Sequence, residues 1–268
     1  MSSIKGSKVL VTGAGAGMGL GMAERFAAEG AELILVDVNP TALEAAAARV
    51  RGAGGNVHSF VCDLAKPAEI EALRARVAAA VGPIDILVNN AGVVTGGTYD
   101  EIPAGKDRLM LDVNVGAVHW MTKAFLPDLK GKRRGHIVNL ASAAGFLGVP
   151  GQVVYCASKW FVIGFSESLR LELEQQGFTD IHITIVCPSF VDTGMFAGVK
   201  APLMTPILRP EYVVGRILDA VKKDRVYVQE PFIVKTTPIL RALLPRKLFD
   251  KLSDRLGVTR SMHTWKGH

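Results

Sequence analysis

The strongest constraint on the fold of this chain is an alternation over its first 190 residues: short β-branched apolar runs separate longer alanine- and leucine-rich segments. The runs predict strands at Lys8–Thr12, Glu32–Val36, Val57–Val61, Ile84–Val88, Gly135–Leu140 and Ile181–Val186. The segments between them predict helices over 18–29, 41–52, 67–80, 106–129 and 152–176. Several strands are apolar on both faces and need helices above and below them. We expect an α/β fold with a doubly wound, mostly parallel sheet.

The net charge of +6 comes from one end of the chain. Residues 1–234 hold 23 basic and 23 acidic side chains, whereas residues 235–268 hold eight basic and two acidic ones. A nucleic-acid-binding protein concentrates basic residues, interleaved with aromatic ones, on one groove or face, and the neutral body does not. We therefore expect no nucleic-acid partner. A protein that binds nucleic acid through its basic C-terminal residues remains one alternative function.

Signals for export and for metal binding are missing from the sequence. No apolar run reaches the roughly 18 to 20 residues that span a bilayer, and the first residues lack the apolar stretch of a secretory signal. We expect a cytoplasmic protein. Cys62, Cys156 and Cys187 have no paired C-x-x-C spacing, and the six histidines have no metal-ligand spacing. Neither a disulfide framework nor a metal site is expected.

A glycine-rich segment, Thr12–Gly19, joins the first predicted strand to the first predicted helix. At such a turn, glycines permit positive φ and let a pyrophosphate approach backbone N–H groups at the positive end of the helix dipole. The segment predicts a dinucleotide site, with a tight turn that binds no ligand as the structural alternative. The candidate cofactor-binding residues in it are Gly13, Ala16, Gly17, Met18 and Gly19.

Asp37 ends the second predicted strand, 18 residues beyond the glycine-rich segment. A carboxylate there accepts hydrogen bonds from both adenosine ribose hydroxyls and repels a 2′-phosphate. Ala16, Val38 and Asn39 offer no cation to such a phosphate. NAD(H) is therefore expected as the cofactor, with NADP(H) as the disfavoured alternative. The alternative role for Asp37 is to cap the turn before Pro40.

Four motifs occur in a specific order: T-G-x-x-x-G-x-G, Asn89–Gly92 after the fourth strand, Ser142 after the fifth, and Tyr155–Lys159. Their order and spacing resemble the short-chain dehydrogenase/reductase family over about residues 8–228. The resemblance implies a single-domain Rossmann fold with a seven-stranded sheet, a nicotinamide cofactor and hydride transfer between an alcohol and a ketone.

The resemblance also implies cofactor contacts at positions that match the family. Asp63 and Leu64 match the adenine contacts. The turn that lines the cofactor is matched by Asn90, Ala91 and Gly92. Contacts beside the nicotinamide are matched by Pro188, Val191 and Thr193. One departure from the family pattern is Ser189, which stands where the family usually has glycine. Serine adds a side chain beside the expected position of the nicotinamide.

Tyr155 and Lys159 are four residues apart in a predicted helix and therefore share one face. A neighbouring ammonium favours phenolate and lowers the pKa of a phenol, which makes Tyr155 the candidate acid and base. Ser142 is expected to hydrogen-bond the substrate oxygen and orient it. Lys159 is also expected to hold the nicotinamide ribose. The resemblance assigns Asn114 to a water that links Lys159 to solvent.

The segments that follow the strands indicate the substrate. Residues 93–94, 143–150 and 190–210 are mostly apolar, and their only charged residues are Asp192, Lys200 and Arg209. A sugar would need buried hydrogen-bonding partners that these segments lack. We expect a hydrophobic alcohol or ketone of steroid, retinoid or fatty-chain type beneath a lid at about 189–210. The structural alternative is that these apolar residues only pack the lid on the core.

Residues 235–268 are predicted to form a basic amphipathic extension of the dehydrogenase domain, which covers 1–234. Pro245 begins and Gly257 ends a predicted helix whose apolar stripe is Leu248, Phe249, Leu252 and Leu256. Packing on protein is favoured, either on a neighbouring subunit or over the pocket of the chain itself. Peripheral contact with an anionic membrane is the alternative.

Taken together, the residues predict an NAD(H)-dependent oxidoreductase that interconverts a hydrophobic secondary alcohol and its ketone. The enzymatic alternative is a 3-oxoacyl-thioester reductase that uses NADPH, which Asp37 disfavours. The alternative from another class is a non-catalytic regulator that binds a dinucleotide. The family resemblance also implies a homodimer or homotetramer formed through the helices at 106–129 and 152–176.

Overall fold

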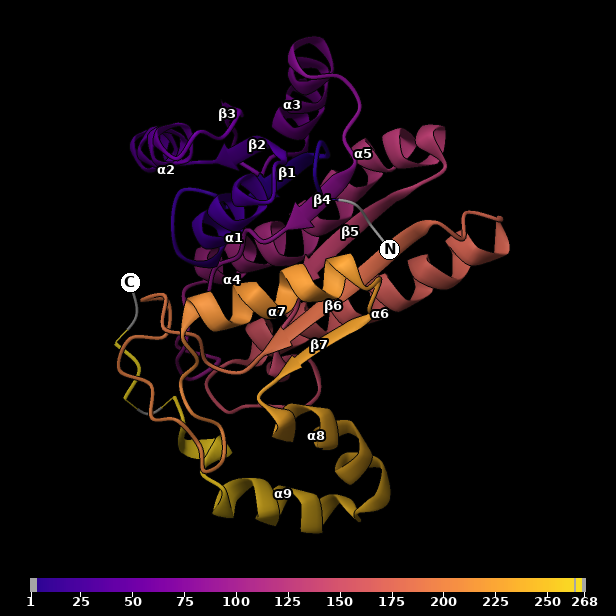
Figure 1. Cartoon of the computed structure of the whole chain (residues 1–268). Helices are drawn as coiled ribbons and strands as arrows, with labels where there is room; N and C mark the ends of the chain where they lie inside the picture. Colours follow the sequence, from indigo (N-terminus) through magenta and orange to yellow (C-terminus); the bar gives the residue numbers. More distant parts are fainter. Residues whose placement is uncertain (1–3, 263, 267–268) are drawn as a thin grey trace.

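The computed structural model describes residues 4–262 and 264–266, and it places seven parallel strands in one sheet (Figure 1). Their order across the sheet is β3-β2-β1-β4-β5-β6-β7. Their bounds are β1 Lys8–Thr12, β2 Glu32–Asp37, β3 Val57–Val61, β4 Ile86–Asn89, β5 Gly135–Leu140, β6 Ile181–Pro188 and β7 Tyr227–Glu230. The six strands that the apolar runs predict are all present, and the doubly wound parallel sheet is confirmed. The sequence pattern did not locate β7, which is only four residues long.

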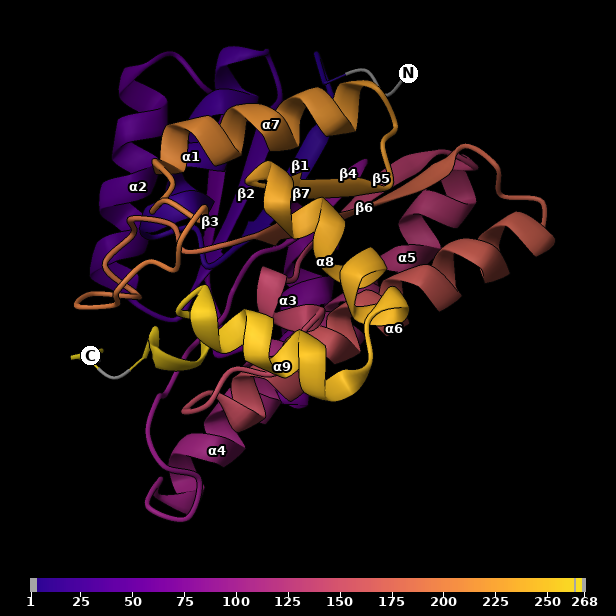
Figure 2. The ribbon, with the colours of Figure 1, turned by 90° about the horizontal axis from the view of Figure 1, so that it is seen from below.

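Helices cover both faces of this sheet. Their bounds are α1 Gly17–Ala28, α2 Pro40–Gly52, α3 Pro67–Ala80, α4 Ala104–Leu111, α5 Val118–Lys132, α6 Val153–Gln175, α7 Pro210–Lys222, α8 Phe232–Leu243 and α9 Arg246–Arg255. Helices α1, α2 and α7 pack on one face, and α3, α5 and α6 pack on the other (Figure 2). The expected fold class, a single-domain α/β Rossmann fold, is therefore confirmed.

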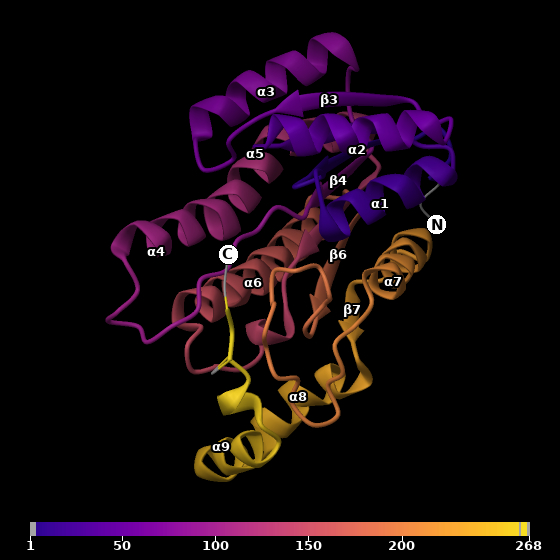
Figure 3. The same cartoon turned by 90° about the vertical axis from the view of Figure 1, so that its left-hand side faces the viewer.

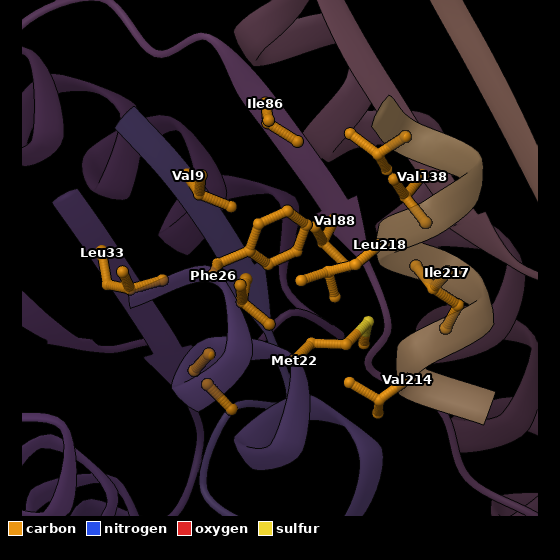
Figure 4. Packing of buried hydrophobic residues seen from close by; sticks show 14 of the residues in the cluster. Val9, Met22, Phe26, Leu33, Ile86, Val88, Val138, Val214, Ile217 and Leu218 are labelled. Carbon is orange, nitrogen blue, oxygen red and sulfur yellow. The ribbon is translucent and has the colours of Figure 1, made fainter. Parts of the chain in front are cut away.

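The two hydrophobic cores follow from the period of the strands. In β1, Val9 and Val11 face one core while Leu10 faces the other, and all three are completely buried. Figure 4 shows Met22 and Phe26 of α1 packed against strand residues and against α7. Because side chains alternate between faces, a strand covered on both sides needs an apolar residue at nearly every position.

The segment predicted as one helix over 106–129 is divided in the structure. Helices α4 and α5 are joined by a π-helical turn, Asp112–Ala117. A π-helical turn is wider than an α-helical one and occurs often at functional sites. Asn114 lies in this turn and is buried. Five of its six residues, in Asp-Val-Asn-Val-Gly-Ala, are poor helix formers, but propensity does not distinguish a π-helical turn from an interrupted helix.

The C-terminal extension contains two helices beside the carboxyl end of β7 (Figure 1). As predicted, α9 begins directly after Pro245 and ends before Gly257. The predicted apolar stripe is wrong in part, because Phe249 is buried whereas 51% of Leu248 is exposed. After α9 the chain turns back toward the loop that follows β6 (Figure 3). No helix within the described residues is long and apolar enough to cross a bilayer.

Candidate active site

A cavity of about 560 Å³ opens at the carboxyl ends of the strands. It is lined by residues from the glycine-rich segment, from the turn after β4, from β5 and α6, and from the loop after β6. The predicted residues among them are Gly13, Ala16, Gly17, Met18, Asp37, Asn90, Ala91, Gly92, Ser142, Tyr155, Lys159, Pro188, Val191 and Thr193. Ligands of open parallel sheets bind at this end. The fold therefore brings most of the predicted site residues to one place.

The glycine-rich segment forms the first wall of the cavity. Gly13 and Gly17 have φ values of 62° and 54°, in the left-handed region that glycine adopts without strain. A β-carbon on Gly19 would collide with the carbonyl oxygen of Gly13. Helix α1 starts in this wall and has no capping side chain, so its first N–H groups are available to an anion. This arrangement fits the pyrophosphate of a dinucleotide.

Thr12 and Asn90 hold the glycine-rich segment against the turn after β4. The Thr12 hydroxyl accepts hydrogen bonds from the N–H groups of Asn90 and Ala91, at 2.9 and 3.1 Å. In return, Asn90 Nδ2 donates to the carbonyl oxygen of Thr12 at 2.8 Å. Sequence reasoning placed Asn90 beside the cofactor and did not identify Thr12. The contacts join residues 78 positions apart, which local sequence patterns do not show.

Asp37 lies at the end of β2 and lines the cavity. One carboxylate oxygen accepts a hydrogen bond from the N–H of Gly15 at 2.8 Å, and the other accepts from the N–H of Asn39 at 2.9 Å. Helix α2 is capped by Asn39, whose side chain accepts hydrogen bonds from Thr41 and Ala42. Asn39 is thus the helix cap, while Asp37 does cap the turn before Pro40, which is the alternative role expected for it. Asp37 also lines the cavity, a position that fits a ribose.

Lys159 is buried beneath the cavity, and its Nζ donates to the carbonyl oxygen of Leu140 at 2.8 Å. Burial lowers the pKa of Lys159 from 10.5 to about 8, because the ammonium loses its water. Near neutral pH the side chain is therefore still charged, but it gives up its proton more readily than an exposed lysine. The one-turn spacing from Tyr155 does bring both side chains to the same cavity.

Tyr155 is 5% exposed and hydrogen-bonds Ser142. Burial raises the pKa of Tyr155 above its usual value of 10, and the hydrogen bond with Ser142 lowers it in part. The expectation that Lys159 lowers this pKa is wrong for the structure described, because burial of the phenol sets the direction and Lys159 is not among the groups that shift the pKa. Lys159 Nζ lies 5.6 Å from the centre of the Tyr155 ring. Tyr155 is therefore a neutral phenol in this structure.

Asn114 lies behind the cavity and not in its wall. Its Oδ1 accepts from the N–H of Val93 at 2.8 Å, and its Nδ2 donates to the carbonyl oxygen of Val93 at 2.9 Å. A β-carbon on Gly92 would lie 3.3 Å from Asn114 Oδ1 and 3.7 Å from Lys159 Nζ, so both side chains flank Gly92. Asn114 thus joins the π-helical turn to the backbone beside Lys159.

The remaining predicted cofactor residues do not line the cavity. Leu64 is buried in the core beside α3, and Asp63 forms an ion pair with Lys66 at 3.1 Å. Gly19 lies inside helix α1, where its role is the close approach to Gly13. The described residues contain no group of three or more His, Cys, Asp or Glu side chains able to hold a metal ion.

The far side of the cavity is apolar. Phe196 lines it and packs edge-on against Tyr155, with 5.9 Å between ring centres, and Phe190 packs against Phe196. Of the other predicted lid residues, Met195 lines the cavity, whereas Leu203, Met204 and Ile207 are exposed. The lid therefore contributes some of its apolar residues to the pocket and turns others outward.

Sequence reasoning missed six residues that line the cavity: Thr95, Lys106, Leu109, Leu140, Ala141 and Trp265. The first three follow the turn after β4 or belong to α4. Trp265 is the surprising one, because it belongs to the basic end of the chain, some 70 residues beyond the lid residue Met195 that it contacts. Only the tertiary structure brings it to the site.

The sequence pattern of the family described as short chain dehydrogenase matches residues 7–203. The chain belongs to the short-chain dehydrogenase family. Among curated proteins it is 40% identical to epidermal retinol dehydrogenase 2 of Mus musculus over 259 residues, which cover 96% of this chain and 84% of that protein. It is 37% identical to human (Homo sapiens) estradiol 17-beta-dehydrogenase 11 over 256 residues, 96% of this chain and 85% of that protein.

Solved structures of short-chain dehydrogenases are similar over nearly the whole chain. One from Burkholderia phymatum in complex with NAD has a TM-score of 0.83 at 28% identity and covers 97% of this chain and 98% of its own. A metagenomic short-chain oxidoreductase in complex with NADP has a TM-score of 0.72 at 31% identity and covers 85% of this chain and 98% of its own. Family and neighbours together support an oxidoreductase whose cofactor is a nicotinamide dinucleotide.

Proposed function

We propose that this short-chain dehydrogenase interconverts a hydrophobic secondary alcohol and its ketone with NAD(H), and that Tyr155 is its acid and base. The observation that carries the proposal is one cavity lined by the glycine-rich segment, by Asp37, and by Ser142, Tyr155 and Lys159. A dinucleotide site and a proton-transfer site therefore share one space, as hydride transfer coupled to proton transfer requires.

The catalytic residues divide the work of proton transfer and orientation. The nicotinamide, when bound, accepts or supplies the hydride. Tyr155 removes the hydroxyl proton of the alcohol in oxidation and returns a proton to the ketone oxygen in reduction. Ser142 hydrogen-bonds the same oxygen and holds it toward Tyr155. Burial keeps the pKa of Tyr155 high, so its neutral phenol is ready to donate to a ketone.

Lys159 and Asn114 support this step from behind the cavity. The Lys159 ammonium holds the nicotinamide ribose and offers positive charge to a developing phenolate of Tyr155. Asn114 keeps the backbone at Val93 in place beside Lys159 through its paired hydrogen bonds. In the family scheme a water held by Asn114 resupplies the proton to Lys159.

Asp37 supports the preference for NAD(H) over NADP(H). Its carboxylate is held at the cavity by the N–H groups of Gly15 and Asn39, so it has little freedom to turn away from a ligand. A 2′-phosphate would meet a negative charge there. At the two neighbouring positions where a cation would bind that phosphate, the chain has Ala16 and Val38, which are uncharged.

The substrate class follows from the apolar end of the cavity. Val94, Met195 and Phe196 line it, and Phe196 packs on Tyr155. The relatives are named for retinol and estradiol, which are large and apolar. We therefore assign a hydrophobic alcohol of steroid, retinoid or fatty-chain type to this end.

Location and assembly are also proposals. Exposed apolar residues on the extension, Ile239, Leu243 and Leu248, are accompanied by basic side chains such as Lys247 and Lys251, which favours peripheral contact of a cytoplasmic enzyme with anionic lipid. A homodimer or homotetramer through α4, α5 and α6 is supported by exposed apolar residues on these helices, among them Leu111, Trp120 and Leu171. Flotation with anionic vesicles and light scattering test the two proposals.

The experiment that tests the function begins with separate titrations of the protein with NADH and NADPH, followed by energy transfer from the tryptophans to the reduced nicotinamide. We expect tighter binding of NADH, and then oxidation of estradiol or a long-chain secondary alcohol to its ketone with NAD. Tighter binding of NADPH would overturn the cofactor assignment and favour the thioester reductase. Binding without turnover of any alcohol or ketone would favour the regulator.

A further inference from the structure

The end of the chain covers the lid of the active site. We define the terminal segment as Ser261 and Met262 together with Thr264–Lys266. Its backbone pairs with the lid, because the carbonyl oxygen of Ser261 accepts from the N–H of Lys200 at 3.1 Å and the N–H of Lys266 donates to the carbonyl oxygen of Ala197 at 3.1 Å. Lid and terminal segment are therefore joined by backbone hydrogen bonds at two points.

Two side chains of the terminal segment, Met262 and Trp265, pack inward, whereas Thr264 and Lys266 are exposed. Met262 is 7% exposed, and its sulfur accepts from Nε2 of Gln152 at 3.2 Å. Trp265 lines the cavity, and its Nε1 donates to the carbonyl oxygen of Met195 at 3.3 Å. Since this bond occupies the only polar group of the indole, the rest of the ring offers an apolar surface.

The indole leaves no room beside the segment that follows β4. A β-carbon on Gly96 would lie 2.8 Å from Met262 Cε and 3.0 Å from Trp265 Cε3. The turn after β4 and the terminal segment are therefore in van der Waals contact. Glycine at position 96 permits this close approach; its φ is not in the left-handed region, so the backbone conformation itself does not require glycine.

Trp265 lies at the substrate end of the cavity. The ribose end is marked by Asp37 and the glycine-rich segment, whereas Trp265, Phe196 and Tyr155 belong to one apolar cluster. Phe196 contacts Tyr155 directly, and Trp265 contacts the backbone of Met195 next to it. A substrate whose oxygen reaches Tyr155 extends its apolar part along this cluster.

We propose that Trp265 determines substrate specificity. Its indole packs against the apolar end of the substrate, the end that lies farthest from the reacting oxygen. This inference rests on the proposed function. It adds the residue that selects large apolar substrates over small ones. A short alcohol reacts at Tyr155 without reaching Trp265. A long or multi-ring alcohol buries apolar surface against the indole. Removing the indole should therefore lower kcat/KM for the large alcohol and not for a short one.

The test compares Trp265→Ala with the wild type, using kcat/KM for secondary decanol and for secondary butanol with NAD. The matched control is Leu203→Ala, which removes an apolar lid side chain that is 68% exposed and does not line the cavity. For Trp265→Ala we expect kcat/KM to fall about 10-fold or more for decanol and to change less than about 2-fold for butanol. The affinity for NADH should be unchanged. Equal losses for both alcohols, or no loss, would overturn the inference.

Gly96→Val tests the same contact without changing a residue of the terminal segment. Its β-carbon meets Met262 Cε, which moves easily, and Trp265 Cε3, and the further methyl groups need space beside the indole, so we expect a selective loss for decanol. A variant that keeps the selectivity of the wild type would contradict the placement of the indole. This second variant decides the question if Trp265→Ala fails to fold.

A binding measurement separates this inference from the proposed function. The variant Trp120→Phe with Trp160→Phe leaves Trp265 as the sole tryptophan of the chain. With NAD present, we expect secondary decanone to change its fluorescence in a saturable way, and butanone to leave it unchanged. If wild-type protein oxidises no alcohol but this titration saturates, only the function is wrong. If alcohols are oxidised and the fluorescence never responds, only the role of Trp265 is wrong.

Discussion

The two ends of the parallel sheet both bury polar side chains, but they use them differently. At the amino ends, His136 is completely buried, and the hydroxyl of Thr184 donates to the carbonyl oxygen of Arg225 at 2.7 Å. Nε2 of His136 therefore donates to Thr184, at 2.7 Å, and the ring is neutral. At the carboxyl ends, Tyr155 and Lys159 face a cavity instead.

The comparison shows what separates a structural polar group from a chemical one. A hollow of about 430 Å³ exists at the amino ends as well, lined by residues such as His136, Asp180 and His182. None of the residues that the motifs single out lies there. Burial shifts pKa values at both ends, so a shifted pKa alone does not mark a catalytic site. The carboxyl end differs because its shifted groups meet a space that also contains the glycine-rich segment.

The largest expected effect breaks the chemistry at the carboxyl end. Tyr155→Phe removes the proton donor and acceptor while it keeps the ring that packs on Phe196. We expect kcat to fall by roughly 10² to 10⁴-fold or more, with NADH binding within about 3-fold of the wild type. Steady-state kinetics and cofactor titration measure both. Tyr99→Phe is the control, because Tyr99 is 60% exposed; retained turnover in Tyr155→Phe would refute the mechanism.

The next effect concerns recognition at the same end. Asp37→Ala removes the carboxylate that supports the preference for NAD(H), and we expect the affinity for NADH to fall about 10-fold or more. The ratio of NADPH to NADH affinity should rise. Asp63→Asn is the matched control, because Asp63 does not line the cavity. Equal effects of the two substitutions on the affinity ratio would argue against Asp37 as the ribose ligand.

The third effect tests the structural end. Burial lowers the pKa of His136 from 6.5 to about 3, so the unfolded chain binds a proton that the folded chain refuses between these values. Stability from this residue is therefore present above pH 6.5 and is lost as the pH falls toward 3, by up to about 1.4 kcal/mol per pH unit. Denaturant unfolding at several pH values measures the slope. His136→Gln should show a shallower slope, and an unchanged one would show that other groups cause the acid sensitivity.

The smallest effect concerns Ser189, whose Oγ is buried and has no hydrogen-bond partner among the described residues. Ser189 also lines the cavity. An unpaired buried hydroxyl destabilises a protein, so Ser189→Ala should raise the free energy of unfolding by about 1 kcal/mol. If the Ser189 hydroxyl forms a hydrogen bond with the bound cofactor, Ser189→Ala should weaken cofactor binding by about 3-fold. Thermal unfolding with and without NADH distinguishes the two effects, and a loss of stability in Ser189→Ala would contradict the first.

Local sequence patterns predicted the parts of the site that local geometry determines. Tyr155 and Lys159 share a cavity because four residues make about one helical turn. The glycines between β1 and α1 recur because a strand that turns directly into a helix needs left-handed backbone at Gly13 and Gly17. These relations hold in any fold that contains the same elements.

Long-range contacts escaped prediction because nothing in a local pattern encodes them. Thr12 supports Asn90 across 78 residues, and β7 is too short for its period to be read. Leu248 belongs to the predicted apolar stripe but is half exposed, because α9 buries Phe249 and leaves the residues on either side of it exposed. The pKa of Tyr155 rises because it is buried, which spacing from Lys159 does not reveal.

The sequence by itself determined the α/β class, the parallel sheet, the glycine-rich segment and the order of the catalytic motifs. Apolar periodicity, glycine positions and one-turn spacing depend on residues close together in the sequence. They can therefore be recognised without knowledge of the whole fold. Only the tertiary structure decided that Trp265 lines the cavity and that Asn114 lies behind it. Packing joins distant segments wherever their surfaces complement each other, and a single sequence does not state which surfaces those are.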